Sequence, residues 1–557
     1  MKKCKFLTVV AAGVMAAAMA LTGCGGNGNT NSGSNSGDNA GSVNTMFPGT
    51  AEAGSITINL GAEPPSMNSV TTTDTVSFQL LHHVKDGLLM KDQNDIPQAA
   101  TAEKYEVSED GLTWTFHIRE DAVWEDGQPV TSNDFKFAWM KVMEPAVASE
   151  YSYMMYYVKG AEDYNVNGGS ADDVGLECPD DKTFVVTLAA PCPYFDSLVA
   201  FPTFYPVRED EWGDDYATEA NKMHYNGMFV MSEWTHNDKI VCTKNDKYYA
   251  ADTCKLDKFV GLMLVDTSAA INAFKAGQLD MVALSTGDQV KEMEASYPGV
   301  SFDSYSDGSS WCLMFNTQDA IFSNVNARKA LTLCLDRASY INNIRKDTSV
   351  PAYHWTVPTL AINGKQFGDV WSENKLITDA DAEGAKAAWE TACSELGIPT
   401  NTEVEYLTDD GEASKTLGEY IQGCAAKAGI TLKIKAVPFK ERLANQTAGT
   451  YQISMYGWGP DYNDPQTFLE LWETGNANNK AFYSNADYDA QMKIIHESTD
   501  AEARMNAMIK AEEVLADTWA IAPFYYRQTT YVCSGKLNNM VRTVFQDWSL
   551  RFASING

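Results

Sequence analysis

Residues 455–465 of this chain read MYGWGPDYNDP, and the apolar run FLELW follows at 468–472. The residues that lead into this stretch, 451–455 (YQISM), alternate as a β-strand does, and two glycines and a proline then interrupt the backbone. We therefore expect Trp458 and Asp461 on a stiffened loop between a strand and a helix. Such a loop can present an aromatic wall and a carboxylate to a ligand. The alternative is a packed turn in which the aspartate caps the next helix.

Other segments predict ordinary elements of a mixed α/β protein. The alternating run at 55–61 (SITINLG) predicts an edge strand stopped by two prolines, and 113–118 (TWTFHI) predicts a strand with one buried face. Thr131 and Asp134 form a weak capping box at the start of a helix. Residues 381–396 predict a helix that ends at Gly397.

Composition restricts the class of protein. The 557 residues suffice for about two or three domains. A hydrophobic content of 44% and an aromatic content of 11% are typical of a globular chain. The formal net charge is −32, and the basic residues form no cluster, which argues against nucleic acid or an anionic lipid surface as a partner.

The N-terminus predicts export. Three lysines precede an apolar run at 6–21, and small residues then lead to a cysteine within Leu21-Thr22-Gly23-Cys24. The alternatives are an ordinary secretory signal or a membrane span, but glycine, asparagine and serine follow at once. The pattern resembles a bacterial lipoprotein signal that is cut before Cys24, which is then acylated. We expect residues 1–23 to be a signal peptide and 24–53 a lipid-anchored flexible linker on the extracellular face of a cell membrane, of the Gram-positive type.

Cysteine usage leaves two interpretations open. Of 11 cysteines, Cys4 lies in the signal and Cys24 carries the lipid, so an odd number remains and not all can pair. Local bridges between Cys178 and Cys192 and between Cys242 and Cys254 are conceivable, and buried free thiols are the alternative. The absence of a C-x-x-C motif argues against a zinc ribbon or a thioredoxin-like site.

The sequence also lacks the common catalytic motifs. G-x-S-x-G, a Walker A loop and H-E-x-x-H are all absent, and the seven histidines are scattered. Chance pairs among 74 acidic residues leave a carboxylate hydrolase as an alternative. We expect no enzyme, no catalytic residues, no metal site and no cofactor.

Residues 118–135 read IREDAVWEDGQPVTSNDF. This order of a hydrophobic-Arg pair, an aromatic residue, Asp-Gly-x-Pro and an Asp-aromatic helix start resembles the signature of the extracellular solute-binding proteins of peptide ABC importers. Residues 458–469 resemble the Trp-x-x-Asp-Tyr-Asn-acid-Pro-x-x-Phe-Leu motif of the oligopeptide-binding branch. Shorter matches, such as 226–229 and 276–280, extend the resemblance over nearly the whole mature chain.

The resemblance implies an α/β, periplasmic-binding-protein-like fold in which two lobes are joined by a hinge, of the three-domain oligopeptide-binding type. Domain I would comprise 54–75, 206–308 and 527–557. Domain II, an addition to the first lobe, would comprise 76–205, and domain III, the second lobe, 309–526. The implied protein is a monomer that closes over its ligand and docks on an ABC permease driven by its ATPase.

The resemblance also implies the roles of particular residues. In the family, the aspartate of the tryptophan motif takes the peptide's ammonium group, which assigns that role to Asp461. The other implied ligand-binding residues are the pairing strand from Gly457 to Gly459, Tyr456 before it, the pocket wall Trp458, the opposite edge at Glu63 and Pro64, and Tyr151 and Tyr153 on the facing lobe. Core packing is the alternative for the two last tyrosines. Gln446 and Met455 stand where some oligopeptide binders carry arginines that help to hold acidic groups of the ligand.

We therefore predict a lipid-anchored binding protein that captures short peptides and delivers them to an ABC importer. The first alternative is the same scaffold with another cargo, such as a dipeptide, a nickel chelate, heme or an oligosaccharide. The second is an adhesin or signalling lipoprotein without a transport function.

Overall fold

The computed structural model describes residues 52–192, 194–297, 300–362, 365–371, 377, 379–498, 500–545 and 548–555. The predicted signal peptide, Cys24 and all but the last two residues of the predicted linker lie outside this part of the chain. Within it, no helix combines the length and the apolar character needed to cross a membrane.

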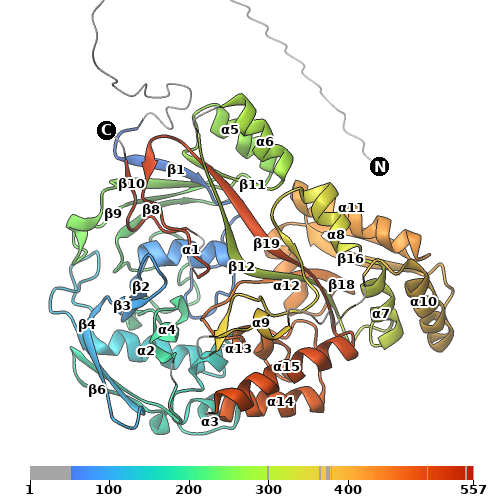
Figure 1. Cartoon of the computed structure of the whole chain (residues 1–557). Coiled ribbons are helices and arrows are strands. Elements are labelled where there is room, and N and C mark those ends of the chain that lie inside the picture. Colours follow the sequence, from blue (N-terminus) through green and yellow to red (C-terminus); the bar gives the residue numbers. More distant parts are fainter. Residues whose placement is uncertain are drawn as a thin grey trace, which may run out of the picture. The chain divides into compact units, whose positions relative to one another are not determined.

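The largest element of the described chain is an 11-stranded mixed sheet (Figure 1). Its strands, in spatial order, are β17 (Thr431–Val437), β16 (Glu403–Asp409), β18 (Ile453–Trp458), β12 (Ser301–Phe315), β19 (Ile521–Cys533), β11 (Met281–Leu284), β1 (Ser55–Asn59), β10 (Lys258–Leu262), β9 (Lys239–Lys244) and β8 (Phe229–Thr235), with β13 (Val350–Pro351) beside β19. Strand β1 lies between β10 and β11, so the prediction of an edge strand at 55–61 is wrong. Its Ile56 and Ile58 are fully buried, as an internal strand requires.

Strands β12 and β19 are the longest strands of the sheet, and Figure 1 shows them running together through its middle. They pair in antiparallel register, which shifts between Ser306 and Ser310. Gly308 lies in this irregular stretch with a φ of +68°, a conformation that glycine adopts without strain. Asp307 fastens the stretch to β19 by accepting hydrogen bonds from Arg527 and Thr529.

A second sheet has four strands, in the order β4 (Ala102–Val107), β5 (Thr113–Ile118), β7 (Thr183–Thr187) and β6 (Leu176–Asp180). The predicted strand at 113–118 is confirmed, since Trp114, Phe116 and Ile118 are buried. Helix α2 (Ser132–Met143) packs on this sheet through Trp139, whose ring meets Phe184 edge to face at 5.1 Å. The predicted capping box of Thr131 and Asp134 is present at its start.

The remaining elements cover the sheets or connect them. Helix α11 packs on β16 and β17, and α5 packs on β11. The helices are α1 (Thr75–Val84), α3 (Ala161–Val166), α4 (Phe195–Val199), α5 (Thr267–Lys275), α6 (Gly287–Ser296), α7 (Val325–Cys334), α8 (Arg337–Ser339), α9 (Gly368–Trp371), α10 (Ala382–Leu396), α11 (Glu412–Lys427), α12 (Phe439–Thr447), α13 (Gln466–Leu469), α14 (Ala486–Glu497) and α15 (Ala501–Asp517). The small strands are β2 (Leu89–Lys91), β3 (Pro97–Ala99), β14 (Ala361–Ile362), β15 (Lys365–Gln366), β20 (Leu537–Asn538) and β21 (Ser554–Ile555).

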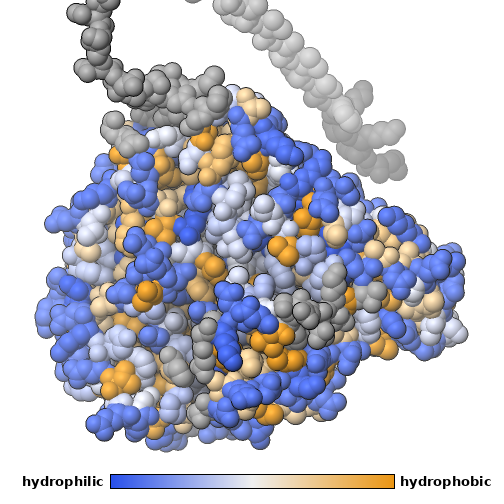
Figure 2. All heavy atoms as spheres, viewed as in Figure 1, coloured by the Kyte–Doolittle hydropathy of each residue, from blue (hydrophilic) through white to orange (hydrophobic). Residues whose placement is uncertain are grey.

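The cysteines of the described chain are all free thiols, so neither of the conceivable local bridges forms. Seven of them, Cys192, Cys242, Cys254, Cys312, Cys334, Cys393 and Cys424, are buried. The exterior is hydrophilic over most of the face in Figure 2, with hydrophobic residues scattered across it.

Candidate functional site

Strand β18 carries the first part of the predicted site and has one open edge. On one side it pairs with β12 along its whole length, from Ile453 opposite Phe315 to Trp458 opposite Ser310. On the other side β16 pairs only with Ile453 and Ser454. Within the described chain, no strand pairs with that side from Met455 to Trp458. The open stretch can accept a further strand by backbone hydrogen bonding.

Gly457 allows β18 and β12 to approach closely. A Cβ atom at this position would lie 2.7 Å from the ring of Trp311, which stacks on Tyr525 at a centroid distance of 6.1 Å and so cannot easily move. A Cβ atom at Gly459 would meet nothing within 4 Å. A larger residue would therefore clash with Trp311 at position 457 but would find open space at position 459.

We predict that Gly457→Ala lowers the free energy of unfolding by about 1–3 kcal/mol, because the added methyl overpacks the contact with Trp311. Gly459→Ala is the matched control and should change it by about 0.5 kcal/mol or less. Urea unfolding followed by tryptophan fluorescence measures both. Equal stability of the two variants would contradict the close contact at Gly457.

Asp461 lies on the loop between β18 and α13, and its side chain does not cap that helix. Its backbone N–H donates to Thr467 Oγ1 at 3.2 Å. The carboxylate that serves the start of α13 is Asp464, whose Oδ1 accepts from the N–H of Gln466 at 3.0 Å and which pairs with Arg504. The alternative of an Asp461 helix cap is therefore wrong, and its carboxylate remains available for another role.

The Asp461 carboxylate is almost fully buried, with 7% of the residue exposed. Tyr151, from a segment 310 positions away, donates its hydroxyl to Oδ1 and Oδ2 at 3.3 Å each. The buried ammonium of Lys91 donates to the backbone carbonyl of Asp461 at 3.1 Å rather than to its carboxylate. Among the residues that the structure describes, the carboxylate has no salt-bridge partner.

Burial dominates the electrostatics of this carboxylate. Loss of water raises the pKa of Asp461 well above its usual value, and the nearby Glu470 adds to the increase. Lys91 and the Tyr151 hydroxyl act in the opposite direction but do not offset it. Glu470 itself is buried, and desolvation raises its pKa to about 7. A cation placed beside Asp461 would restore its ionised form.

Aromatic rings surround the carboxylate. Trp458 and Tyr456 stack at a centroid distance of 6.1 Å, and Tyr151 lies 6.1 Å from Trp458. Tyr153 is next to Tyr151 at 5.8 Å. The Nε1 atom of Trp458 is buried and has no hydrogen-bond partner within the described part of the chain. A buried donor without a partner suggests an acceptor that a ligand would supply.

Sequence reasoning missed most of the contacts between the segment before residue 205 and the segment after residue 309. Lys480 forms an ion pair with Glu150 at 2.5 Å. Gln466 bonds the Tyr157 and Tyr194 hydroxyls at 2.6 and 3.2 Å. Gln466 occupies an unspecified position of the tryptophan motif, so the motif itself did not predict these contacts. Lys91, the most directly placed of the missed residues, gives no signal because a lysine in a three-residue strand predicts an exposed position.

The structure does not bring Glu63 into this cluster. Its carboxylate accepts hydrogen bonds from Trp234 Nε1 at 2.9 Å and from the Asn237 N–H at 2.7 Å, and it pairs with His236 at 2.7 Å. Pro64 beside it is buried. The side chain of Glu63 is thus used within its own neighbourhood, and a role of this segment in binding stays a prediction that concerns its backbone.

Comparison with known proteins identifies the family. The profile of the bacterial extracellular solute-binding proteins, family 5 Middle, matches residues 97–480. The chain is 32% identical to the oligopeptide-binding protein OppA of Bacillus subtilis over 508 residues, covering 87% of this chain and 90% of that protein. It is 30% identical to the dipeptide-binding protein DppE of the same organism over 505 residues, covering 90% and 91%.

A solved structure agrees over the same length. The structure of Listeria monocytogenes OppA bound to peptide superposes with a TM-score of 0.85 at 32% sequence identity, covering 90% of this chain and 99% of that one. The mixed α/β fold predicted from the resemblance is confirmed. The matching proteins are binding proteins, in agreement with the prediction that the chain is no enzyme. The chain belongs to the bacterial extracellular solute-binding proteins of family 5.

Proposed function

We propose that this protein captures short peptides by their N-terminal ammonium group and delivers them to an ABC importer. The observation that carries the proposal is the Asp461 carboxylate, buried among aromatic rings with no salt-bridge partner in the described chain. A buried charge without a counter-ion is costly, and a bound ammonium group removes that cost. A free amino terminus is the cation that all unmodified short peptides share.

The open edge of β18 supports the same ligand. A peptide whose amino terminus sits at Asp461, beyond the end of β18, would run back along the strand towards Met455, antiparallel to it. Each backbone hydrogen bond formed there contributes about 1 kcal/mol net to binding and does not depend on the side chains of the peptide. The unpartnered indole N–H of Trp458 can donate to a peptide carbonyl.

The relatives support this cargo. The Bacillus subtilis proteins are named for oligopeptide and dipeptide binding, and the Listeria monocytogenes protein was solved with a peptide. Among the described residues, those around Asp461 are tyrosine, tryptophan and lysine, not the histidines that would favour a metal chelate.

The proposal also covers membrane attachment, the division into domains and the delivery of the ligand. Lipid attached to Cys24 would hold the protein at the extracellular face, and the linker to residue 53 would let it move. The division into domains I, II and III, closure about β12 and β19, and docking of a monomer on the permease and its ATPase follow from the resemblance. The contacts of Tyr151 and Lys91 with Asp461 are those that closure would make.

The experiment is native mass spectrometry of protein purified from its own source. We expect adducts whose masses correspond to mixed short peptides, which fragmentation then sequences. Calorimetric titration of ligand-stripped protein with a tetrapeptide, and with the same peptide N-acetylated, tests the anchor. Binding of another solute class with no affinity for either peptide would refute the proposal.

A further inference from the structure

Glu150 connects two segments that the proposed division assigns to different lobes. It precedes Tyr151 in domain II, and its carboxylate pairs with the ammonium of Lys480, in domain III, at 2.5 Å. Thr447 donates its hydroxyl to the same carboxylate oxygen at 3.2 Å, and Asn478 donates its side-chain amide to the Glu150 carbonyl at 3.1 Å. Three side chains of the second lobe thus hold one residue of the first. We call these four residues, Glu150, Thr447, Asn478 and Lys480, the Glu150 latch.

The half of the latch that the second lobe contributes is fastened to the strand of the candidate site. The Tyr456 hydroxyl donates to the Asn478 carbonyl at 3.4 Å, and the Tyr451 hydroxyl donates to the Lys480 carbonyl at 2.5 Å. Tyr456 lies on β18, and Tyr451 lies just before this strand. Both hydrogen bonds lie within the second lobe, so we expect them to persist when the lobes separate. This half of the latch is therefore in place before closure.

The latch adjoins the amine anchor along the chain. Tyr151, the residue after Glu150, donates its hydroxyl to both oxygens of the Asp461 carboxylate. Because a single peptide bond links Glu150 to Tyr151, the contacts that fix Glu150 also restrict the position of the Tyr151 hydroxyl. Closure that forms the latch would therefore also complete the surroundings of Asp461.

The ion pair of the latch is shielded from water. Only 10% of the Lys480 side chain and 21% of the Glu150 side chain are exposed. The attraction between two charges is stronger in such a place than between hydrated ions. It outweighs the loss of hydration only where both charges keep further hydrogen bonds, which Thr447 and the Ala477 carbonyl supply here. The pair therefore favours the closed form.

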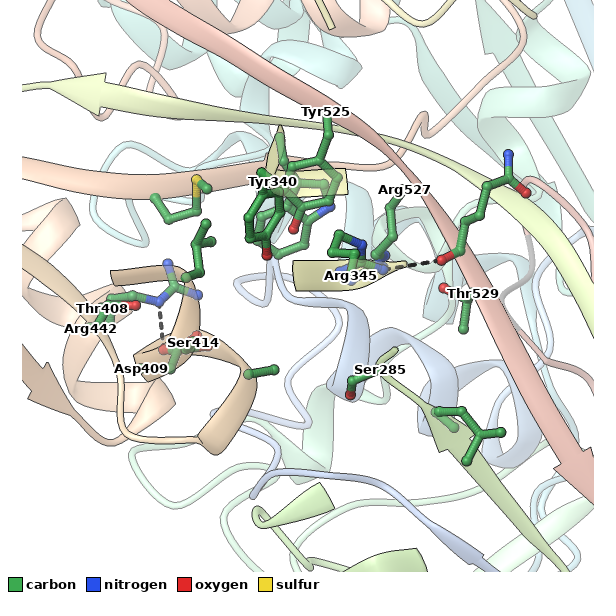
Figure 3. Close-up of a pocket in the computed structure, with 17 residues that line it drawn as sticks. Ser285, Tyr340, Arg345, Thr408, Asp409, Ser414, Arg442, Tyr525, Arg527 and Thr529 are labelled. Atoms are coloured by element: carbon green, nitrogen blue, oxygen red, sulfur yellow. Dashed lines mark hydrogen bonds and ion pairs between the residues drawn. The ribbon is translucent and has the colours of Figure 1, made fainter. Parts of the chain in front are cut away.

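The opposite end of the proposed cleft is held less firmly. Met455, at the far end of the open edge of β18, lines a cavity of about 220 Å³, and Ser285 and Ser414 line it from the two predicted lobes (Figure 3). The Lys346–Asp288 ion pair also joins these lobes, but 39% and 58% of the two side chains are exposed. Exposed pairs contribute little, because water solvates both charges. The Glu150 latch is therefore the stronger of these two connections.

The latch is separate from the surface on which the peptide would lie. None of its four residues belongs to the open stretch of β18 at 455–458. A contact that forms only on closure increases the population of the form that encloses the ligand, and the apparent affinity increases in proportion. Such a contribution does not depend on the side chains of the peptide. It differs in this respect from the contribution of a side-chain pocket.

We propose that the Glu150 latch sets the lifetime of the closed complex and so increases the affinity for every captured peptide by the same factor. The inference rests on the proposed function, because it requires closure over a peptide. It makes Glu150 and Lys480 positioning residues, which hold the lobes together and touch no part of the ligand.

The experiment measures the association and dissociation rates of three tetrapeptides with unrelated side chains by stopped-flow tryptophan fluorescence. Lys480→Met should increase all three dissociation rates by roughly 5- to 30-fold, between the effects typical of exposed and of buried ion pairs. Glu150→Gln removes the other charge and should act similarly. The association rates should stay within about twofold of the parent, since the loss of a short-range contact acts on dissociation.

The charge-reversed protein, with Glu150→Lys and Lys480→Glu together, should recover part of the loss, whereas Glu150→Lys alone should release peptide faster than Glu150→Gln. Asp288→Asn is the matched control, because Asp288 forms an exposed ion pair between the same lobes, and it should change the rates about twofold or less. Parent-like dissociation in both Lys480→Met and Glu150→Gln overturns the latch, and so does a loss confined to one peptide, which would place Lys480 against the ligand. A parent protein that binds no peptide refutes the proposed function and the latch together.

Discussion

Asp461→Asn is expected to weaken the binding of a free-amine tetrapeptide by roughly 140- to 4,000-fold, since breaking a buried ion pair costs about 3–5 kcal/mol. Asparagine keeps the shape of the side chain and can still accept the Tyr151 hydroxyl, so the loss reports charge rather than packing. Calorimetric titration measures it. The N-acetylated peptide, which has no ammonium group, should bind wild type and variant with equal weakness.

The matched control for this variant is Asp487→Asn, an exposed aspartate in the first turn of α14. Its affinity for the free-amine peptide should equal that of the parent. Unchanged affinity in Asp461→Asn would remove the amine anchor and, with it, the reason for choosing peptides as the cargo.

The affinity for peptide is expected to fall about tenfold per pH unit as the pH drops through the raised pKa of Asp461. Without ligand, burial and Glu470 favour the protonated carboxyl; with the ammonium in place, the carboxylate is favoured. Binding must therefore release a proton in that pH range. Above the raised pKa the carboxylate is already ionised, and its protonation no longer affects the affinity. The ligand's own amino group loses its proton near about pH 8, which weakens binding at higher pH.

Titrations in two buffers of different ionisation enthalpy measure the number of protons released. Asp461→Asn is the control and should lose this release. Glu470 contributes to the raised pKa of Asp461, so Glu470→Gln should shift the midpoint of the affinity curve to lower pH. A wild-type protein that releases no proton on binding at any pH at which the peptide's amino group stays charged would contradict a buried, protonated Asp461.

The sequence predicted those parts of the fold whose signal is local. The strand at 113–118 shows a clear alternation, and the capping box before α2 depends only on Thr131 and Asp134. Helix α10 begins after Asp381 and ends at Gly397, as these two cap residues indicate. The prediction that 55–61 is an edge strand was wrong because local alternation and nearby prolines do not show which strands pair with it. Its two neighbours, β10 and β11, lie more than 190 residues further along the chain.

Only the part of the candidate site that lies in or next to the tryptophan motif could be predicted from the sequence. Asp461, Trp458 and the glycines lie within a few residues and could be named from sequence. Lys91 and Glu470 could not, because their roles depend on burial and on contacts between distant segments.

The free cysteines have a consequence for how the chain matures. Burial raises the pKa of the Cys192 thiol to about 12 and also raises that of Cys242 and Cys312, so little thiolate exists in the native protein. No disulfide bond stabilises the described part of the chain, so its folding outside the cell would need no oxidase. The same thiols become reactive only when the core opens, which makes alkylation a direct gauge of how often this protein unfolds.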